Sequence, residues 1–195
     1  MFNFHLAFVV LFILFITIRV YYNVRAGGHR DPSYSPVEGA LVYRIRQMAL
    51  IPFPVLLVLH MVAPQWFAWA TWPFPDVVRW FGLGLAVLSL PELIWVHHNL
   101  GRNFSGTIRI RGDHQLVTSG PYRWVRHPMY PGLLAFVVGT LLLTGYWLIM
   151  LPALIGLLLI IVTRTPREEK QLIEQFGDTY HQYMQRTKRF IPGVW

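Results

Sequence analysis

The feature that most limits how this chain can fold is a stretch of 33 residues, 131–163, that contains no charged side chain. As a single helix it would measure about 50 Å at 1.5 Å per residue, which exceeds the ~30 Å hydrocarbon core of a bilayer. A turn at 144–147, in the sequence TGYW, would divide the stretch into two antiparallel segments. The sequence therefore predicts a helical hairpin with spans at about 131–144 and 147–163.

Three further apolar runs occupy positions 4–20, 48–63 and 77–96, and their lengths are close to the ~17–25 residues that a helix needs to cross a bilayer. Charged residues make up only 13% of the chain, about half of their share in a typical soluble domain. Because every backbone polar group in lipid must be hydrogen-bonded within its own segment, these runs are expected to be helices. We predict an all-α integral membrane protein with five transmembrane helices, folded as one domain over residues 1–195.

The distribution of basic residues predicts the topology. Sixteen of the 17 Lys and Arg residues lie in three segments, at 19–46, 102–126 and 164–189. The positive-inside rule places these three segments in the cytoplasm, so the N-terminus is outside and the tail, 164–195, is cytoplasmic. The net charge of +8 then reflects topology and attraction to anionic headgroups, and nucleic acid is not an expected partner. In a prokaryote, such a multi-pass protein would lie in the cytoplasmic membrane.

Several residue types exclude or suggest particular chemistries. The chain has no cysteine, which excludes disulfides, thiolate nucleophiles and cysteine metal sites. His97 and His98 are adjacent, so on a helix they point roughly 100° apart and do not chelate one ion; no metal is expected. Glu92 is an ionisable group inside a predicted span, and either lines a polar cavity or extends to the interface. The tryptophans at 66–72 resemble an aromatic belt at the outer membrane boundary.

The most crowded segment of the chain, GPYRWVRHPMYPG at 120–132, directly precedes the uncharged stretch. Pro128 and Pro131 disfavour a helix before about residue 131, and Pro131 suits the first position of the fourth span. Upstream, alternating residues at 108–117 suggest a small β-hairpin. We therefore expect an ordered cytoplasmic loop that leads into a helix N-terminus, where backbone amides hold carboxylates well.

The cytoplasmic tail has the pattern of an amphipathic helix. Residues 165–168, Thr-Pro-Arg-Glu, fit a capping box with Thr165 as N-cap and Glu168 at the third position. Gly177 interrupts the helical pattern and suggests a bend or a close approach. The apolar and aromatic face of the helix is expected to contain Leu172, Phe176, Tyr180 and Tyr183.

Two motifs in order resemble one known family. RHPMYPG at 126–132, followed by RTPREEKQLIEQFGDTYHQY at 164–183, is similar to the isoprenylcysteine carboxyl methyltransferases, which have phospholipid N-methyltransferases as relatives. The segment HQLVTSGPY at 114–122 matches as well, so the resemblance extends from about residue 100 to the C-terminus. It implies a cytoplasmic pocket for S-adenosylmethionine, formed by the entrance of the fourth span and the tail helix, and a lipophilic or prenylated acceptor in the bilayer.

The resemblance also implies roles for individual residues. Arg164 would orient an acceptor carboxylate, for which a guanidinium has suitable bidentate geometry. An amine acceptor would instead need a base, such as Glu169 or His127. Contacts to the cofactor are implied for His114, Gln115, Leu116, Val117, Tyr122, His127, Pro128, Met129, Tyr130 and Glu168.

Other functions remain open at this point. A phospholipid N-methyltransferase shares the motifs, a sterol-type membrane reductase would bind NADPH at a similar entrance, and a non-catalytic scaffold would use the tail to dock a partner. Tandem glutamates suit a cationic cofactor better than a polyphosphate, which favours methyl transfer. The motifs do not identify the acceptor or the oligomeric state.

Overall fold

The computed structural model describes residues 2–26, 52–101 and 116–193. The predicted all-α architecture is confirmed for these residues, which contain helices and 3-10 turns but no strand. The elements are α1 (Phe4–Arg25), α3 (Pro52–Val62), η1 (Pro64–Ala70), α4 (Asp76–Leu100), η3 (Gly120–Arg123), α5 (Met129–Thr144), α6 (Trp147–Phe176) and α7 (Asp178–Arg186).

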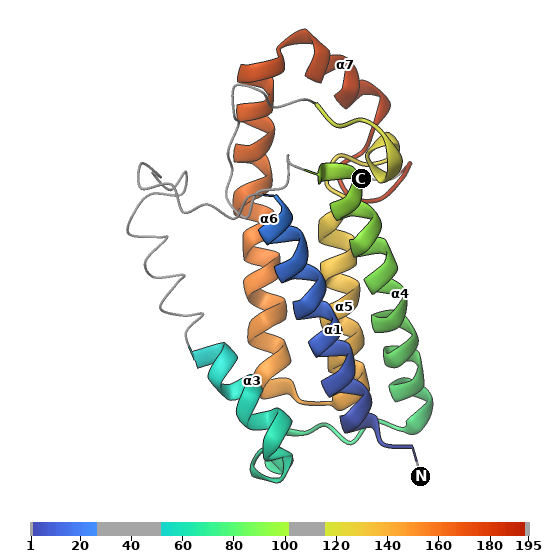
Figure 1. Cartoon of the computed structure of the whole chain (residues 1–195), viewed down its shortest axis with the longest axis vertical. Helices are drawn as coiled ribbons and strands as arrows, with labels where there is room; N and C mark the ends of the chain where they lie inside the picture. Colours follow the sequence, from blue (N-terminus) through green and yellow to red (C-terminus); the bar gives the residue numbers. More distant parts are fainter. Residues whose placement is uncertain (1, 27–51, 102–115, 194–195) are drawn as a thin grey trace.

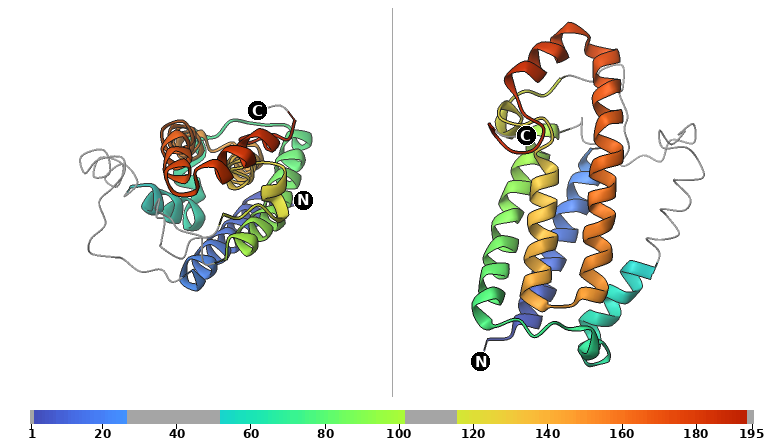
Figure 2. Two further views of the ribbon diagram at one scale, coloured as in Figure 1. Left: turned by 90° about the horizontal axis from the view of Figure 1, so that it is seen from above. Right: turned by 180° about the vertical axis from the view of Figure 1, so that it is seen from behind.

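Four helices, α1, α4, α5 and α6, run side by side along the long axis of the molecule, and α3 lies beside the lower part of α6 (Figures 1 and 2). Among the described residues, α1, α4 and α6 are long and apolar enough to cross a membrane, whereas α5 has 16 residues and α3 has 11. The membrane-protein assignment is supported. The count of five spans and the orientation stay predictions, and residues 48–51 of the second span lie outside the described part of the chain.

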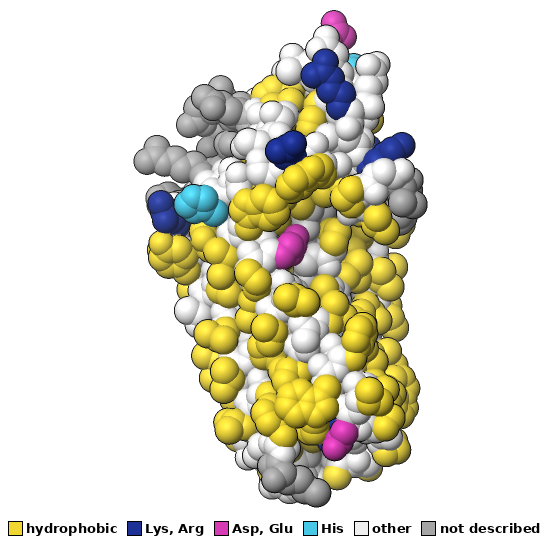
Figure 3. All heavy atoms as spheres, turned by 90° about the vertical axis from the view of Figure 1, so that its right-hand side faces the viewer, with side chains coloured by type: hydrophobic (Ala, Val, Ile, Leu, Met, Phe, Trp, Pro, Cys, Tyr) yellow, Lys and Arg dark blue, Asp and Glu magenta, His cyan; other side chains and the backbone are white. Residues whose placement is uncertain are grey.

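The surface has a large apolar part and a basic end, as the distribution of residues in the sequence predicts. Apolar side chains cover most of the face shown in Figure 3, and the basic side chains lie towards its upper end. Trp66, Trp69 and Trp72 are exposed near the opposite end, where the predicted aromatic belt was placed. An apolar, lipid-facing middle with a basic end is the pattern of a protein embedded in a bilayer.

The hairpin in the uncharged stretch is confirmed. α5 ends at Thr144 and α6 begins at Trp147, and Gly145 between them adopts a left-handed conformation with φ +73°. The Gly145 carbonyl accepts a hydrogen bond of 2.9 Å from the amide of Trp72. A side chain at this position would overlap the Trp72 backbone, so glycine is needed both for its φ and for the close approach.

Small residues bring α4 and α5 into direct backbone contact. A Cβ atom added to Gly82 would lie 2.6 Å from the Leu143 amide nitrogen, and one added to Gly139 would lie 2.7 Å from the Ala86 nitrogen. On the other side of α5, Phe136 stacks on Phe15 of α1 with ring centroids 4.2 Å apart. The second half of α5 is therefore packed closely between α4 and α1.

Two predicted helix boundaries in this region are wrong. α6 continues through Thr165 and Pro166 to Phe176, so the Thr-Pro-Arg-Glu sequence is helix interior and not a capping box. The preceding span already supplies helical turns, so the helix continues although Pro166 removes one backbone hydrogen bond and crowds the carbonyl one turn before it. At the other boundary, α5 begins at Met129, so Pro131 is its third residue and not its first. The first helical turn needs no bond from a Pro131 amide, which explains why it is tolerated there.

The tail forms two helices and not one. α6 ends at Gly177, whose φ of +51° turns the chain, and α7 follows directly. The bend expected at Gly177 is confirmed, but it separates Leu172 and Phe176 on α6 from Tyr180 and Tyr183 on α7. α6 is 30 residues or about 45 Å long, longer than a ~30 Å core, so its final turns extend beyond a bilayer and carry α7 over the end of the bundle (Figure 1).

Candidate functional site

After α7, the chain returns to the loop that precedes α5. The amide of Arg126 donates to the Lys188 carbonyl at 2.8 Å, and the amide of His127 donates to the Arg189 carbonyl at 2.9 Å. A third bond of 3.4 Å runs from the Lys188 amide to the Trp124 carbonyl. We call residues 187–190 the tail strap. Its backbone pairing with 124–127 joins the chain just after the second sequence motif to the loop that carries the first.

Glu169 lies at the centre of an ion-pair cluster beneath this pairing. Its carboxylate accepts a hydrogen bond of 2.9 Å from Arg126 Nε and bonds of 2.6 and 3.0 Å from Arg189, and it lies 3.4 Å from His127 Nε2. Burial alone would raise the pKa of Glu169, but the nearby His127 ring and the hydrogen bonds from Arg189 and Arg126 outweigh burial and lower the pKa to about 2. The same contact raises the pKa of Arg189. Glu169 is therefore held as a carboxylate.

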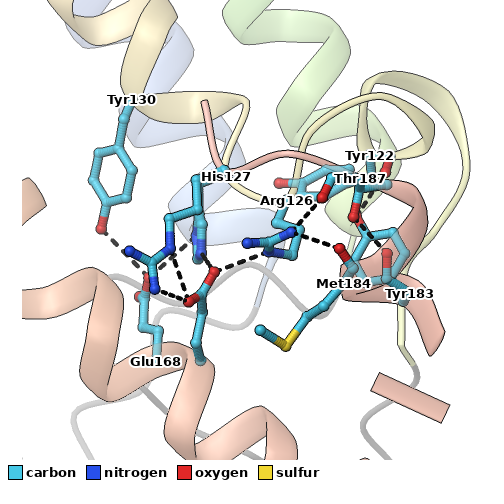
Figure 4. Close-up of polar contacts among 10 residues, drawn as sticks. Tyr122, Arg126, His127, Tyr130, Glu168, Tyr183, Met184 and Thr187 are labelled. Carbon is cyan, nitrogen blue, oxygen red and sulfur yellow. Dashed lines mark hydrogen bonds and ion pairs between the residues drawn. The ribbon is translucent and has the colours of Figure 1, made fainter. Parts of the chain in front are cut away.

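Arg126 connects this cluster to the end of α7. Its Nη1 donates to the carbonyls of Met184, at 3.3 Å, and of Thr187 (Figure 4). The Thr187 hydroxyl in turn donates to the Tyr183 carbonyl at 2.7 Å. One arginine of the loop thus satisfies a carboxylate on α6 and the carbonyls at the end of α7.

Glu168 is in a different environment from its neighbour. Arg164 Nε donates to Glu168 Oε1 at 2.8 Å, the Tyr130 hydroxyl donates to Oε2 at 3.4 Å, and His127 Nδ1 lies 3.7 Å from Oε2. The Glu168 side chain is 20% exposed, compared with 5% for Glu169. Glu168 is consequently the accessible carboxylate of the site (Figure 4).

Three aromatic rings lie together beside Glu168. The ring centroids of His127, Tyr130 and Phe190 are 5.9–6.1 Å apart in each pair. Phe190 belongs to the tail strap, so the strap contributes a ring to the wall of the site. Neither Phe190 nor Arg189 was identified from the sequence, because no local pattern links the tail end to the loop.

Tyr122 connects the loop before α5 to α7. It is buried, and its carbonyl accepts a 2.6 Å hydrogen bond from the hydroxyl of Tyr183 on α7. Burial raises the pKa of both tyrosines, so they remain neutral at ordinary pH. Tyr183 was predicted as part of an apolar face; its hydroxyl is also a hydrogen-bond donor that fixes the position of Tyr122.

The structure brings most of the predicted site residues to one place, at the end of the bundle where α5 begins. His114 and Gln115 lie outside the described residues, and Leu116 and Val117 are partly buried residues that precede η3. The sulfur of Met129 lies 3.4 Å from Nη1 of Arg19 on α1. The residues that converge are Tyr122, His127, Pro128, Tyr130, Arg164, Glu168 and Glu169.

The remaining candidates lie apart from this cluster. Within the described ranges, no group of three His, Cys, Asp or Glu side chains could hold a metal ion. His97 is fully buried, with Nδ1 2.6 Å from the Leu93 carbonyl, whereas His98 is exposed, so the two rings diverge. Glu92 is partly buried on α4, and a Cβ atom on Gly132 would overlap its carboxylate.

Comparisons with known proteins identify the family. A model of the "Isoprenylcysteine carboxyl methyltransferase (ICMT) family" matches residues 82–174, from α4 to the end of α6. A probable protein-S-isoprenylcysteine O-methyltransferase of Oryza sativa subsp. indica is 33% identical over 128 residues, which cover 62% of this chain and 67% of that protein. The chain belongs to the isoprenylcysteine carboxyl methyltransferase family. The family resemblance of the two motifs is thereby confirmed.

Other relatives show how much of the family protein is present. The match to the Schizosaccharomyces pombe protein-S-isoprenylcysteine O-methyltransferase has 36% identity over 48% of this chain and 41% of that protein. The match to isoform B of Arabidopsis thaliana has 35% identity over 57% and 58%, respectively. The chain spans about half the length of these curated relatives. It also shares the fold of a solved eukaryotic intramembrane Ras methyltransferase, with a TM-score of 0.54 and 24% identity over 80% of this chain and 53% of that one.

Proposed function

We propose that this protein transfers a methyl group from S-adenosylmethionine to the carboxylate of a lipophilic, isoprenylcysteine-type acceptor at the cytoplasmic face of a membrane. One observation carries the proposal. The accessible carboxylate of Glu168 and the guanidinium of Arg164 lie together, 2.8 Å apart, at the mouth of an apolar bundle. An acidic group suits a cationic donor, and a neighbouring cation suits an anionic acceptor.

The residues of the site fit the chemistry of the donor. Glu168 can accept charge-assisted hydrogen bonds from an ammonium or a ribose hydroxyl. The ring faces of Tyr130 and Phe190 can lie against a sulfonium or an adenine. Backbone amides at the start of α5 can bind a carboxylate. Bound there, S-adenosylmethionine would supply a methyl group on a sulfonium, which a carboxylate oxygen can take by direct displacement without any proton transfer.

The roles of the chain's own side chains follow from this reaction. A carboxylate acceptor needs no base, so Arg164 has to orient it, and most of the rate comes from positioning and from exclusion of water. Glu169, with two arginine partners and a pKa of about 2, binds a proton too weakly to act as a base near neutral pH. We therefore assign Glu169 to holding the tail strap and the loop together, in place of the catalytic role considered from the sequence.

The same geometry disfavours the alternatives. An N-methyltransferase acting on a protonated amine would need a base, and of the two candidates Glu169 is unsuited to that role, which leaves His127 alone. A reductase would have to accommodate the phosphates of NADPH beside Glu168, where like charges repel. In the proposed arrangement the five predicted helices cross a cytoplasmic membrane and the acceptor enters the site from the bilayer.

The proposal is tested by methyl transfer in detergent or reconstituted membranes. Purified protein would be given S-adenosylmethionine with a labelled methyl group, together with a prenylcysteine analogue or extracted phospholipids. The expected result is a base-labile methyl ester on the prenylcysteine analogue. Label on a lipid nitrogen, or thermal stabilisation by NADPH and not by S-adenosylmethionine, would overturn the assignment.

A matched pair of variants tests the cofactor role of Glu168. Glu168→Gln removes a charge-assisted contact, so the Kd for S-adenosylhomocysteine should rise about 10- to 100-fold. Glu174→Gln, on the same helix, changes an exposed carboxylate whose partner is Lys170 at 3.8 Å, and should leave the Kd unchanged. Equal effects of the two substitutions on the measured Kd would contradict the proposed pocket.

A further inference from the structure

A charged residue of α1 lies close to the site described above but outside the family's matched region. Arg19 is the sixteenth of 22 residues in this apolar helix. Its Nη1 lies 3.4 Å from the sulfur of Met129, the first residue of α5, and 3.0 Å from Nε2 of His97 on α4. Since an ionisable residue within a membrane helix is a functional candidate by default, the direction of this side chain calls for an explanation.

His97 fixes the direction of the Arg19 side chain. The His97 ring is fully buried, and its Nδ1 lies 2.6 Å from the Leu93 carbonyl. A carbonyl oxygen can only accept, so Nδ1 carries the hydrogen and Nε2 presents its lone pair. Arg19 Nη1 therefore donates to Nε2, and the guanidinium is held at the inner ends of α1, α4 and α5.

Arg19 also lies close enough to Arg164 for their charges to interact. Arg164 is held by Glu168 through its Nε, which fixes the second guanidinium from the side of α6. Two positive charges held in a region of low dielectric attract a carboxylate more strongly than one does. Four helices thus converge on a position suited to a negative group.

We propose that Arg19 is a second cation of the acceptor site, which binds the acceptor carboxylate together with Arg164, and that His97 positions it. This inference rests on the proposed carboxyl methyltransferase function. A carboxylate has two oxygens, so each guanidinium can hold one of them. The position of Arg19 within the apolar helix α1 matches an acceptor that enters from the bilayer, with its carboxylate directed towards the cytoplasmic donor.

The test compares binding of a carboxylate with binding of its uncharged analogue. Wild type and Arg19→Gln would be titrated with a prenylcysteine analogue bearing a free carboxylate and with the corresponding carboxamide. For Arg19→Gln we expect the acid to bind at least about 10-fold more weakly, a change typical of losing one hydrogen bond between charged groups. Affinities for the carboxamide and for S-adenosylhomocysteine should stay within about twofold.

The control is Arg25→Gln on the same helix, because Arg25 is exposed and donates to the hydroxyl of Tyr21. It should keep the wild-type preference for acid over amide. If Arg19→Gln lost S-adenosylhomocysteine binding through misfolding, Arg19→Lys would test the role of Arg19 in its place. It keeps the charge but not the planar fork, and should show a reduced preference with cofactor binding intact.

The outcomes separate this inference from the proposed function. A wild-type preference for acid over amide in both Arg19 variants would overturn the role of Arg19 and leave the methyltransferase assignment standing. A wild-type protein that transfers no methyl group to the acid would instead refute the proposed function, and the role of Arg19 with it.

Discussion

The buried carboxylate of Glu169 gives the most quantitative prediction. Replacing it by glutamine keeps the shape but removes the charge that pairs with Arg126 and Arg189. A pKa lowered from the usual 4.5 to about 2 corresponds to about 3 kcal/mol in favour of the ionised, folded state, at 1.36 kcal/mol per pKa unit. Glu169→Gln should therefore reduce the free energy of unfolding near pH 7 by about 3 kcal/mol.

The pH dependence of this difference provides a second check. Because the folded-state pKa is lowered, the stabilisation is fully present above about pH 4.5 and is lost as the pH falls towards about 2. The difference between wild type and Glu169→Gln should shrink to about 1 kcal/mol near pH 3. Denaturant unfolding in a mild detergent at several pH values, followed by tryptophan fluorescence, measures it.

Glu174→Gln is again the matched control, since Glu174 is exposed on the same helix and its pair with Lys170 should contribute less than about 1 kcal/mol. Equal stability losses in the two variants would refute the account of the Glu169 cluster. So would a difference between wild type and Glu169→Gln that did not change between pH 7 and pH 3.

Three further predictions concern residues in the site and in the helices around it. Phe190→Ala should weaken S-adenosylhomocysteine binding several-fold in calorimetry, because it removes a ring of the proposed pocket, and Phe190→Leu should weaken it less. Gly139→Ala should lower the Tm markedly, because its Cβ would lie 2.7 Å from the Ala86 backbone nitrogen, whereas Gly132→Ala meets the flexible end of the Glu92 side chain and should lower the Tm less. Tyr183→Phe removes the bond to the Tyr122 carbonyl and should reduce the free energy of unfolding by about 1–2 kcal/mol.

Much of the site could be predicted because its parts are local in sequence. The loop before α5 and the tandem glutamates on α6 are recognisable as motifs, and the hairpin between them follows from the length of the uncharged stretch. The different environments of Glu168 and Glu169, one accessible and one buried, could not be predicted from the sequence. Neighbours on a helix point roughly 100° apart, so Glu168 faces the accessible side and Glu169 the buried side.

The errors have physical causes as well. Thr165 and Pro166 have the composition of a helix start, and only the preceding span, which continues without interruption, makes them helix interior. The tail strap was missed because it pairs with the loop through backbone groups, which every residue possesses. Arg189 and Phe190 receive their roles from that pairing, 62 or more residues away in the chain from Arg126 and His127.

The unbroken course of α6 means that one rod is both a membrane anchor and a wall of the site. The bilayer sets the depth and tilt of its apolar part, whereas Tyr130 belongs to α5, which is packed against α4 through close backbone contacts. A helix whose apolar length exceeds the local lipid thickness tilts, and a tilt of α6 would displace Arg164 and Glu168 relative to Tyr130. The length of the lipid acyl chains would therefore change the distance between Tyr130 on α5 and the pair Arg164 and Glu168 on α6.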